Sequence, residues 1–235
     1  MICKTAAIVL KNTNYSETSI ICQMYTRELG VRTYILQSVR KGKSAIKPSM
    51  IQPLSLVDID VYEKKNANIN RIKELKNNPI LYNIQDSMIK KSVAMFLVEI
   101  LNQCITEEQY EVELFDFIQE QVLALENKDM SPLFPIRFLV LFSFHLGVQP
   151  QGVYSSETPY FSLDEGVFTN EVGNHTIASK PAQLLSFILH NPDEDIKVHS
   201  DIRKETLDCI IKYYQYHILK RQKLNSVEIL SALLA

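Results

Sequence analysis

The spacing of apolar residues changes once along this chain, and that change constrains the fold more than any other feature. Up to Asn78 the apolar residues follow the period of two that is typical of β-strands, with many β-branched members. After Pro79 they recur every three to four residues, as on amphipathic helices. We therefore expect an α+β protein in which a strand domain, residues 1–79, precedes a helical domain, residues 80–235.

The first region predicts five short strands separated by a glycine turn at Gly30 and a basic loop. This pattern fits a small closed barrel, either an OB-fold or an SH3-like barrel. Within the third strand, Arg32 and Tyr34 share one face because strand side chains alternate. The expected strands cover residues 5–11, 18–26, 31–36, one or two stretches of 50–62, and 70–76.

The second region predicts at least six helices. Ser131 is the expected N-cap of the third, with Pro132 at its first position, and Gly147 ends it. Ser179 is the expected cap of the fourth. The other helices cover 86–104, 114–125, 202–220 and 226–234, and residues 149–175 form a loop with a small hairpin around FSLDEGVF.

Charge separates the two regions. The net charge of −2 hides 13 basic against 6 acidic residues through Asn78, and 12 basic against 21 acidic residues afterwards. An excess of Lys and Arg in one domain is typical of a surface that binds nucleic acid.

The basic residues of the first region gather around the third strand and the loop after it. Lys and Arg neutralise phosphates, and an aromatic ring on the same face offers a platform for an unpaired base. A solvated basic loop is the simpler alternative. We predict a DNA-binding face made of Arg32, Tyr34, Arg40, Lys41, Lys43 and Lys47, extended by Lys64 and Lys65.

No residue pattern indicates catalysis or a cofactor. Lys41-Gly42-Lys43-Ser44 lacks the upstream glycine of a phosphate-binding P-loop. The five histidines show no metal-ligand spacing and lie beside no nucleophile motif. The four cysteines are spread along the chain without a CxxC pair, which favours reduced, buried thiols. We expect neither an enzyme nor a metal site.

A late helix carries both an apolar stripe and several cations. The stripe predicts a core helix with a solvated face, and the cations leave open a surface for an acidic partner peptide. Candidate partner residues are Arg203, Lys204, Lys212, Lys220 and Arg221. The start of the chain does not resemble a signal peptide, and no run is long enough to span a bilayer, so we expect a cytoplasmic protein without a membrane partner.

Several segments, in order, resemble the RecO family of bacterial recombination mediators. They include AAIVLKNTNYSETSIICQMYTRELGVRTYI, SVRKGKSAIKPSMIQPLSLVDIDVY, KSVAMFLVEIL, FHLGVQPQG and YYQYHIL. The resemblance implies an N-terminal OB-fold and a helical C-terminal domain. It also implies binding to single- and double-stranded DNA, annealing of complementary strands, work with RecR and the SSB tail, indirect action on RecA, nucleoid association and no catalysis.

The chain departs from that family in one respect. Many members carry two cysteine pairs that form a zinc site after the third helix, and here residues 149–175 contain no cysteine. We expect the hairpin to be held by packing of Tyr160, Phe161, Leu163, Val167 and Phe168 instead. The alternative to a DNA-binding mediator is a non-catalytic adaptor whose barrel is only structural.

Overall fold

The computed structural model describes residues 2–39, 45–63, 67–106, 111–127, 129–219, 224–227 and 230. The chain divides into two compact units, Met1–Lys128 and Asp129–Ala235, which are taken one at a time below. Among the helices in those ranges, none is long and apolar enough to cross a membrane.

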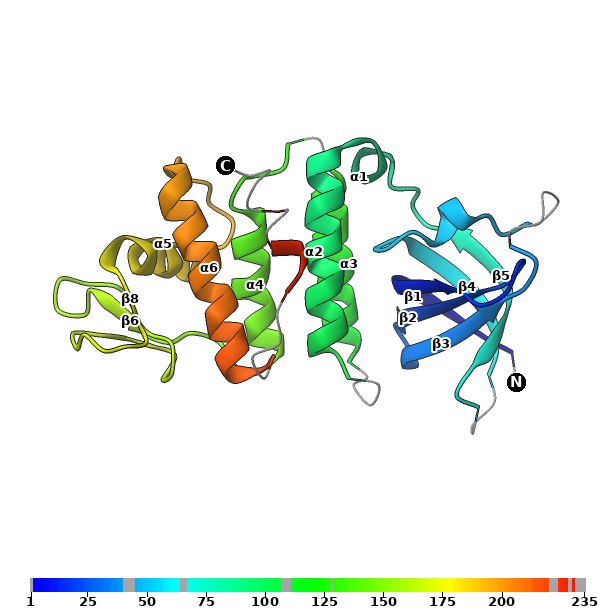
Figure 1. The fold of residues 1–235 in the computed structure, drawn as a ribbon, viewed down its shortest axis with the longest axis horizontal. Helices are drawn as coiled ribbons and strands as arrows, with labels where there is room; N and C mark the ends of the chain where they lie inside the picture. Colours follow the sequence, from blue (N-terminus) through cyan, green and yellow to red (C-terminus); the bar gives the residue numbers. More distant parts are fainter. Residues whose placement is uncertain are drawn as a thin grey trace. The chain divides into compact units, whose positions relative to one another are not determined.

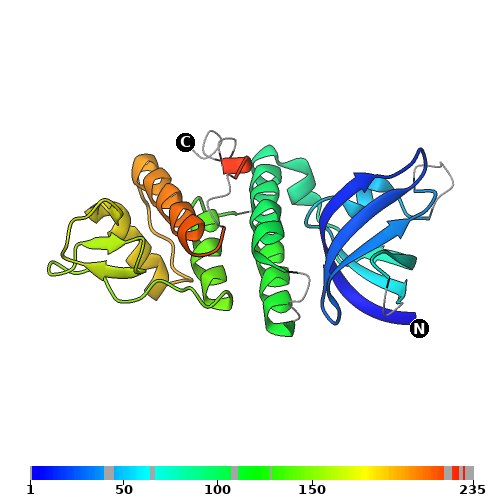
Figure 2. The ribbon, with the colours of Figure 1, turned by 60° about the horizontal axis from the view of Figure 1, so that its bottom comes forward.

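The first unit begins with a closed five-stranded barrel (Figure 1). Its strands are β1 (Ile2–Asn14), β2 (Ile20–Thr26), β3 (Gly30–Leu36), β4 (Leu56–Tyr62) and β5 (Asn70–Asn77). They pair in the order β1-β2-β3-β5-β4, with β3 and β5 parallel, and β1 pairs with both β2 and β4. Figure 2 shows β1 curving around the barrel to do so. This closed topology confirms the predicted OB-fold.

The barrel core follows from strand alternation. In β4, Val57, Ile59 and Val61 are buried, whereas Asp58 and Tyr62 are exposed. The prediction of strand from residue 50 was wrong, because Pro48–Ile51 form a 3₁₀ helix and β4 begins at Leu56. Leu54 explains the late start, since its φ of 63° is incompatible with an extended strand.

Three helices complete the first unit: α1 (Tyr82–Asp86), α2 (Met88–Cys104) and α3 (Val112–Glu126). The buried Lys90 of α2 donates from Nζ to the carbonyls of Leu125 (2.7 Å), Glu126 (3.2 Å) and Asn127 at the end of α3. The Glu126 carboxylate accepts the backbone N–H groups of Asn83 and Ile84 at 2.8 and 2.9 Å. The Lys90 ammonium group therefore pairs with free carbonyls at the carboxyl end of α3, and the Glu126 carboxylate pairs with free N–H groups at the amino end of α1.

Polar contacts also join these helices to the barrel. Arg27 of β2's turn donates two hydrogen bonds, of 2.8 and 2.9 Å, to the Asp116 carboxylate on α3. The Tyr25 hydroxyl donates to the Glu111 carbonyl at 3.2 Å, and Asn102 on α2 donates to the Leu10 carbonyl at 3.3 Å. The compact unit therefore extends past residue 79 to Lys128.

In the described part of the second unit, helices pack beside a small sheet. The helices are α4 (Phe134–His145), α5 (Ser179–His190) and α6 (Ser200–His217), and the sheet contains β6 (Tyr160–Ser162), β7 (Val167–Thr169) and β8 (Thr176–Ile177). Two buried tyrosines of α6 donate to carbonyls: Tyr213 to Val148 at 2.7 Å and Tyr214 to Leu139 at 2.6 Å. Phe161 contacts Phe168 and Tyr213, with ring centroids 5.0 and 5.7 Å apart.

Several predicted boundaries shift. The helix α4 begins at Phe134, and Ser131 precedes it in a turn, where its hydroxyl accepts the Leu133 N–H and donates to Asp195. Ser179 is already the first residue of α5, so it is not the cap. The last α6 residue is His217, and most of the predicted helix 226–234 lies outside the described ranges.

Candidate nucleic-acid interface

Three of the eight predicted DNA-binding residues lie within the described part of the chain. Arg40, Lys41, Lys43, Lys64 and Lys65 lie outside the described residues. Lys47 is exposed in extended backbone directly before the 3₁₀ helix. Arg32 and Tyr34 lie on β3, where they share a face as predicted.

The shared face of Arg32 and Tyr34 is the inner one. Tyr34 is 0% exposed and belongs to the barrel core together with Val9, Met24 and Val61. Burial, reinforced by the nearby Glu63 carboxylate, raises the pKa of its hydroxyl, while Arg32 opposes that rise. The expected stacking platform at Tyr34 was therefore wrong, because alternation fixes which residues share a face and not which face points outward.

Arg32 is engaged within the barrel. Its Nε lies 3.5 Å from the Glu63 carboxylate, and its Nη1 donates to the Val31 carbonyl at 2.9 Å. The side chain is 37% exposed. A phosphate at Arg32 would have to compete with Glu63.

The outer surface of the barrel is divided by charge. One hollow of about 440 Å³ is lined by four carboxylates against two lysines, Lys4 and Lys76. Lys4 pairs with Asp60 at 3.6 Å and Lys76 with Glu74 at 3.0 Å. This face repels a polyanion. The carboxylates are Glu28, Asp58, Asp60 and Glu74.

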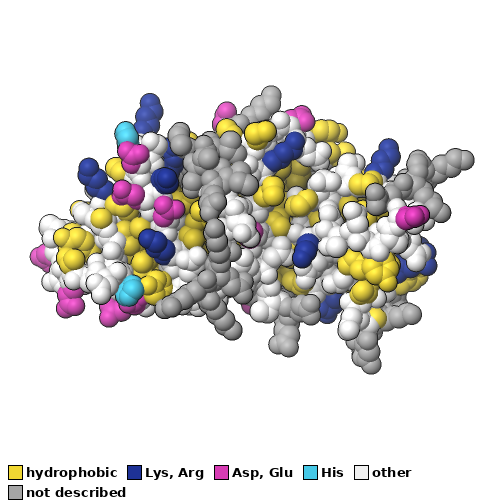
Figure 3. All heavy atoms as spheres, viewed as in Figure 1, with side chains coloured by type: hydrophobic (Ala, Val, Ile, Leu, Met, Phe, Trp, Pro, Cys, Tyr) yellow, Lys and Arg dark blue, Asp and Glu magenta, His cyan; other side chains and the backbone are white. Residues whose placement is uncertain are grey.

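A second hollow lies at the start of β5. It measures about 630 Å³ and is lined by Tyr62, Ala67 and residues 69–73. Arg71 and Lys73 are exposed there, and neither belongs to an ion pair with another described residue. On the face of the barrel seen in Figure 3, Lys and Arg side chains lie among exposed apolar ones. The DNA-binding face predicted from the sequence did not include Tyr62.

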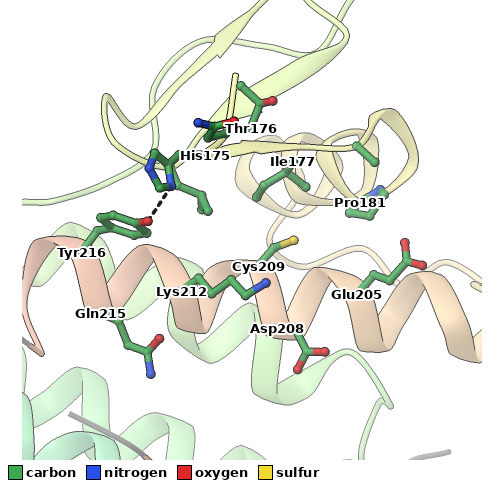
Figure 4. A pocket seen from close by; sticks show the side chains of 13 residues that line it. His175, Thr176, Ile177, Pro181, Glu205, Asp208, Cys209, Lys212, Gln215 and Tyr216 are labelled. Carbon is green, nitrogen blue, oxygen red and sulfur yellow. Dashed lines mark hydrogen bonds between the residues drawn. The ribbon is translucent and has the colours of Figure 1, made fainter. Parts of the chain in front are cut away.

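The second unit has a pocket of about 610 Å³ between β8, α5 and α6 (Figure 4). Lys212 lines it, but so do Glu205 and Asp208, and the Tyr216 hydroxyl lies 2.6 Å from His175 Nδ1. Of the other predicted partner residues, Arg203 and Lys204 do not line this pocket, and Lys220 and Arg221 lie outside the described ranges. The pocket is thus of mixed charge.

Comparison with known proteins assigns both halves of the chain. The sequence model for Recombination protein O N terminal matches residues 1–78, and the one for Recombination protein O C terminal matches residues 85–226. This chain belongs to the RecO family.

Members of this family match the present chain over almost its whole length. DNA repair protein RecO of Azobacteroides pseudotrichonymphae is 30% identical over 98% of both chains. The protein of the same description from Phocaeicola vulgatus is 30% identical over 99% of both, and that from Flavobacterium psychrophilum is 28% identical over 97% of both. Membership of the RecO family supports a role in DNA repair and recombination.

The cysteines of this RecO-family chain are all free. Burial raises the pKa of Cys22 and of Cys104 to about 12. Burial also raises the pKa of Cys209 to about 11, with Lys212 opposing and Asp208 and Glu205 adding to the shift. These thiols are therefore protonated at neutral pH. Within the described ranges, no three His, Cys, Asp or Glu side chains are grouped to hold a metal ion.

Proposed function

We propose that this chain is a recombination mediator that binds single- and double-stranded DNA through its barrel. In this role it anneals complementary strands and, with RecR, helps load RecA onto SSB-coated DNA. The observation that carries the proposal is the match of both RecO family segments, in order, over nearly the whole chain. The closed OB-fold supports it, because such barrels bind nucleic acid.

The proposed DNA-binding residues are the cations around the barrel. Lys47 is exposed, and Arg40, Lys41, Lys43, Lys64 and Lys65 extend the set by sequence alone. Arg32 contributes only where a phosphate displaces Glu63. Phosphate contacts carry little base information, so the proposed binding is largely independent of sequence.

The test is a titration of labelled single-stranded DNA with the whole protein at several salt concentrations. The logarithm of the binding constant should fall linearly with the logarithm of the salt concentration, by about 0.7 for each phosphate contact. A folded protein that binds neither strand form at low salt would contradict the proposal. Competition with duplex DNA in the same assay measures the second binding mode.

We also propose a non-catalytic, metal-independent, cytoplasmic protein associated with the nucleoid, with a functional boundary at residues 79/80. The pKa values of all four thiols are raised, and the described cysteines form no cluster that could hold a metal ion. Both observations support the first two statements. Elemental analysis of the purified protein tests the metal statement, and zinc that remains stoichiometric after dialysis would overturn it.

For partner binding, we propose that cations of α6 contact the acidic, apolar-ended SSB tail. Lys212, Arg203 and Lys204 supply charge, with Lys220 and Arg221 added by sequence alone. Titration of the whole chain with such a peptide should show binding that weakens in Lys212→Ala. If both that variant and an Arg203→Ala, Lys204→Ala double variant bind the peptide as tightly as the unmodified protein, α6 is not the contact.

A second candidate, an adaptor that binds proteins, is favoured by exposed apolar side chains in the first unit. Met95, 57% exposed, lines a groove of about 240 Å³ between α1, α2 and the turn before β4. Met88 of α2 and Tyr82 of α1 do not line it and are 72 and 64% exposed. An adaptor with a structural barrel would show no salt-dependent DNA binding, so the same titration separates the two functions.

A further inference from the structure

A row of outward-pointing side chains crosses four strands of the barrel. Strand pairing places Ile21 beside Ile35, Ile35 beside Arg71 and Arg71 beside Tyr62. These four are exposed or half-buried, so they point away from the core. Their neighbours along the strands are buried, as alternation requires: Cys22, Tyr34, Leu36, Asn70, Ile72 and Val61.

The row ends in an aromatic ring beside a guanidinium. Tyr62 is 41% exposed, whereas Tyr34 of the core is 0% exposed. Arg71 and Tyr62 are direct cross-strand partners, and both line the hollow of about 630 Å³. Lys73 lines the same hollow, and none of the ion pairs between described residues occupies either cation.

We propose that this hollow is the base-binding subsite for single-stranded nucleic acid. The Tyr62 ring stacks on an unpaired base, the Arg71 guanidinium lies against the same or the next base, and Lys73 neutralises a phosphate. This inference rests on the proposed function and names the residues that read the unpaired strand. A flat ring and a guanidinium suit any base, because each base has a π-face.

Charge on the barrel favours this path over the alternative one. The hollow with Asp58, Asp60 and Glu74 carries an excess of carboxylates, and both of its lysines are already paired. A polyanion avoids that face and follows the row toward β3 and β2, where Ile35 and Ile21 offer apolar contact.

Tyrosine fluorescence cannot isolate one residue here, but the chain contains no tryptophan. Tyr62→Trp therefore creates a single reporter at the proposed subsite. Tyr82→Trp on α1 is the matched control, because Tyr82 is 64% exposed and lies outside the hollow. On addition of an oligothymidylate, the emission of the Tyr62→Trp variant should be quenched by stacking, and that of the Tyr82→Trp variant should not.

Affinity gives an independent measure. Tyr62→Ala should weaken single-strand binding about 5- to 150-fold with an unchanged salt slope, because stacking releases no counterion. Tyr62→Phe should retain the affinity, and Lys73→Ala should lower the slope by about 0.7, because Lys73 is the residue that neutralises a phosphate. Thermal unfolding of each variant verifies that it is folded.

The outcomes separate this subsite from the proposed function. If the unmodified protein binds no single strand, the proposed function fails and the subsite fails with it. If the unmodified protein binds, but Tyr62→Ala has the same affinity and the Tyr62→Trp emission does not change, the subsite is overturned and DNA binding stands.

Discussion

Tyr34 of the barrel and the buried tyrosines of α6 place their hydroxyls differently. In the second unit, Tyr213 and Tyr214 are buried and each donates to a backbone carbonyl, so both act as ties between α6 and its neighbours. In the barrel, Tyr34 is buried with no hydrogen-bond partner for its hydroxyl among the described residues, and Tyr62 is exposed. The barrel therefore has an exposed aromatic side chain at Tyr62, whereas the buried Tyr213 and Tyr214 of α6 stabilise the fold.

The largest expected difference between the two units is in DNA binding, and reversing charge in each unit tests it. Changing Arg40, Lys41 and Lys43 together to Glu should lower the salt slope for single-stranded DNA by about 2. When the salt concentration falls from about 1 M to about 0.1 M, the affinity of this variant should therefore rise about 100-fold less than that of the unmodified protein. The matched variant reverses Lys197, Lys204 and Lys212, three exposed lysines of the second unit. The salt slope of this second variant should not change. An equal decrease of the slope in both variants would mean that both units bind the DNA backbone.

Loss of the buried Lys90 charge should produce the largest of the predicted changes in the free energy of unfolding. Lys90→Met removes the donor to three carbonyls at the end of α3 and should lower the free energy of unfolding by about 2–3 kcal/mol. Denaturant unfolding measures the change. Lys91→Met is the control, because Lys91 is the exposed neighbour and its loss should have almost no effect.

Removal of single hydroxyls should distinguish the two kinds of buried tyrosine. Tyr214→Phe loses the 2.6 Å hydrogen bond to Leu139 and should lower the free energy of unfolding by about 1 kcal/mol. Tyr34→Phe removes a hydroxyl without a described partner and should be neutral or stabilising. Comparable losses in both variants would show that the Tyr34 hydroxyl is bonded in solution.

The smallest effect should come from the ion pair between the barrel and α3. Hydrogen bonding to Arg27 holds the pKa of Asp116 below its ordinary value of 3.8. The contribution of the Arg27–Asp116 ion pair to the free energy of unfolding is therefore complete above pH 3.8 and is lost as the pH falls through the lowered pKa. Both side chains are partly exposed, so the contribution should be below about 1 kcal/mol.

Acid unfolding of Asp116→Asn measures this contribution. The variant should be less stable than the unmodified protein at neutral pH and should match it at the lowest pH. Asp86→Asn, which changes an exposed carboxylate on α1, is the control. A constant difference across the pH range would assign the loss to packing rather than to the ion pair.

The sequence predicted the elements better than the site. Period two predicted all five strands, and period 3.6 predicted α2 and α3 to within two residues at each end, because those periods reflect burial along each element. The platform at Tyr34 failed because the inner and outer faces of β3 both carry apolar and polar residues. Lys90 gave no signal, since it stands next to Lys91 and its partner carbonyls lie about 35 residues away in the sequence.

The position of Tyr62 could have been anticipated. It follows Val57, Ile59 and Val61 in strict alternation, and the even-numbered positions Asp58 and Asp60 mark its face as the solvent side. The hollow beside it could not, because it depends on how Ala67 and residues 69–73 lie against Tyr62 once β4 and β5 pair.

The ties between the barrel and α3 also bear on how such a protein can be rearranged during evolution. Family boundaries fall at residues 78 and 85, but Arg27 and Tyr25 reach across them to Asp116 and to the carbonyl of Glu111. A barrel transferred alone to another protein would leave these partners behind. The portion that can be inherited or exchanged as one module is therefore the 128-residue unit, and gene fusions that preserve the barrel should carry α1, α2 and α3 with it.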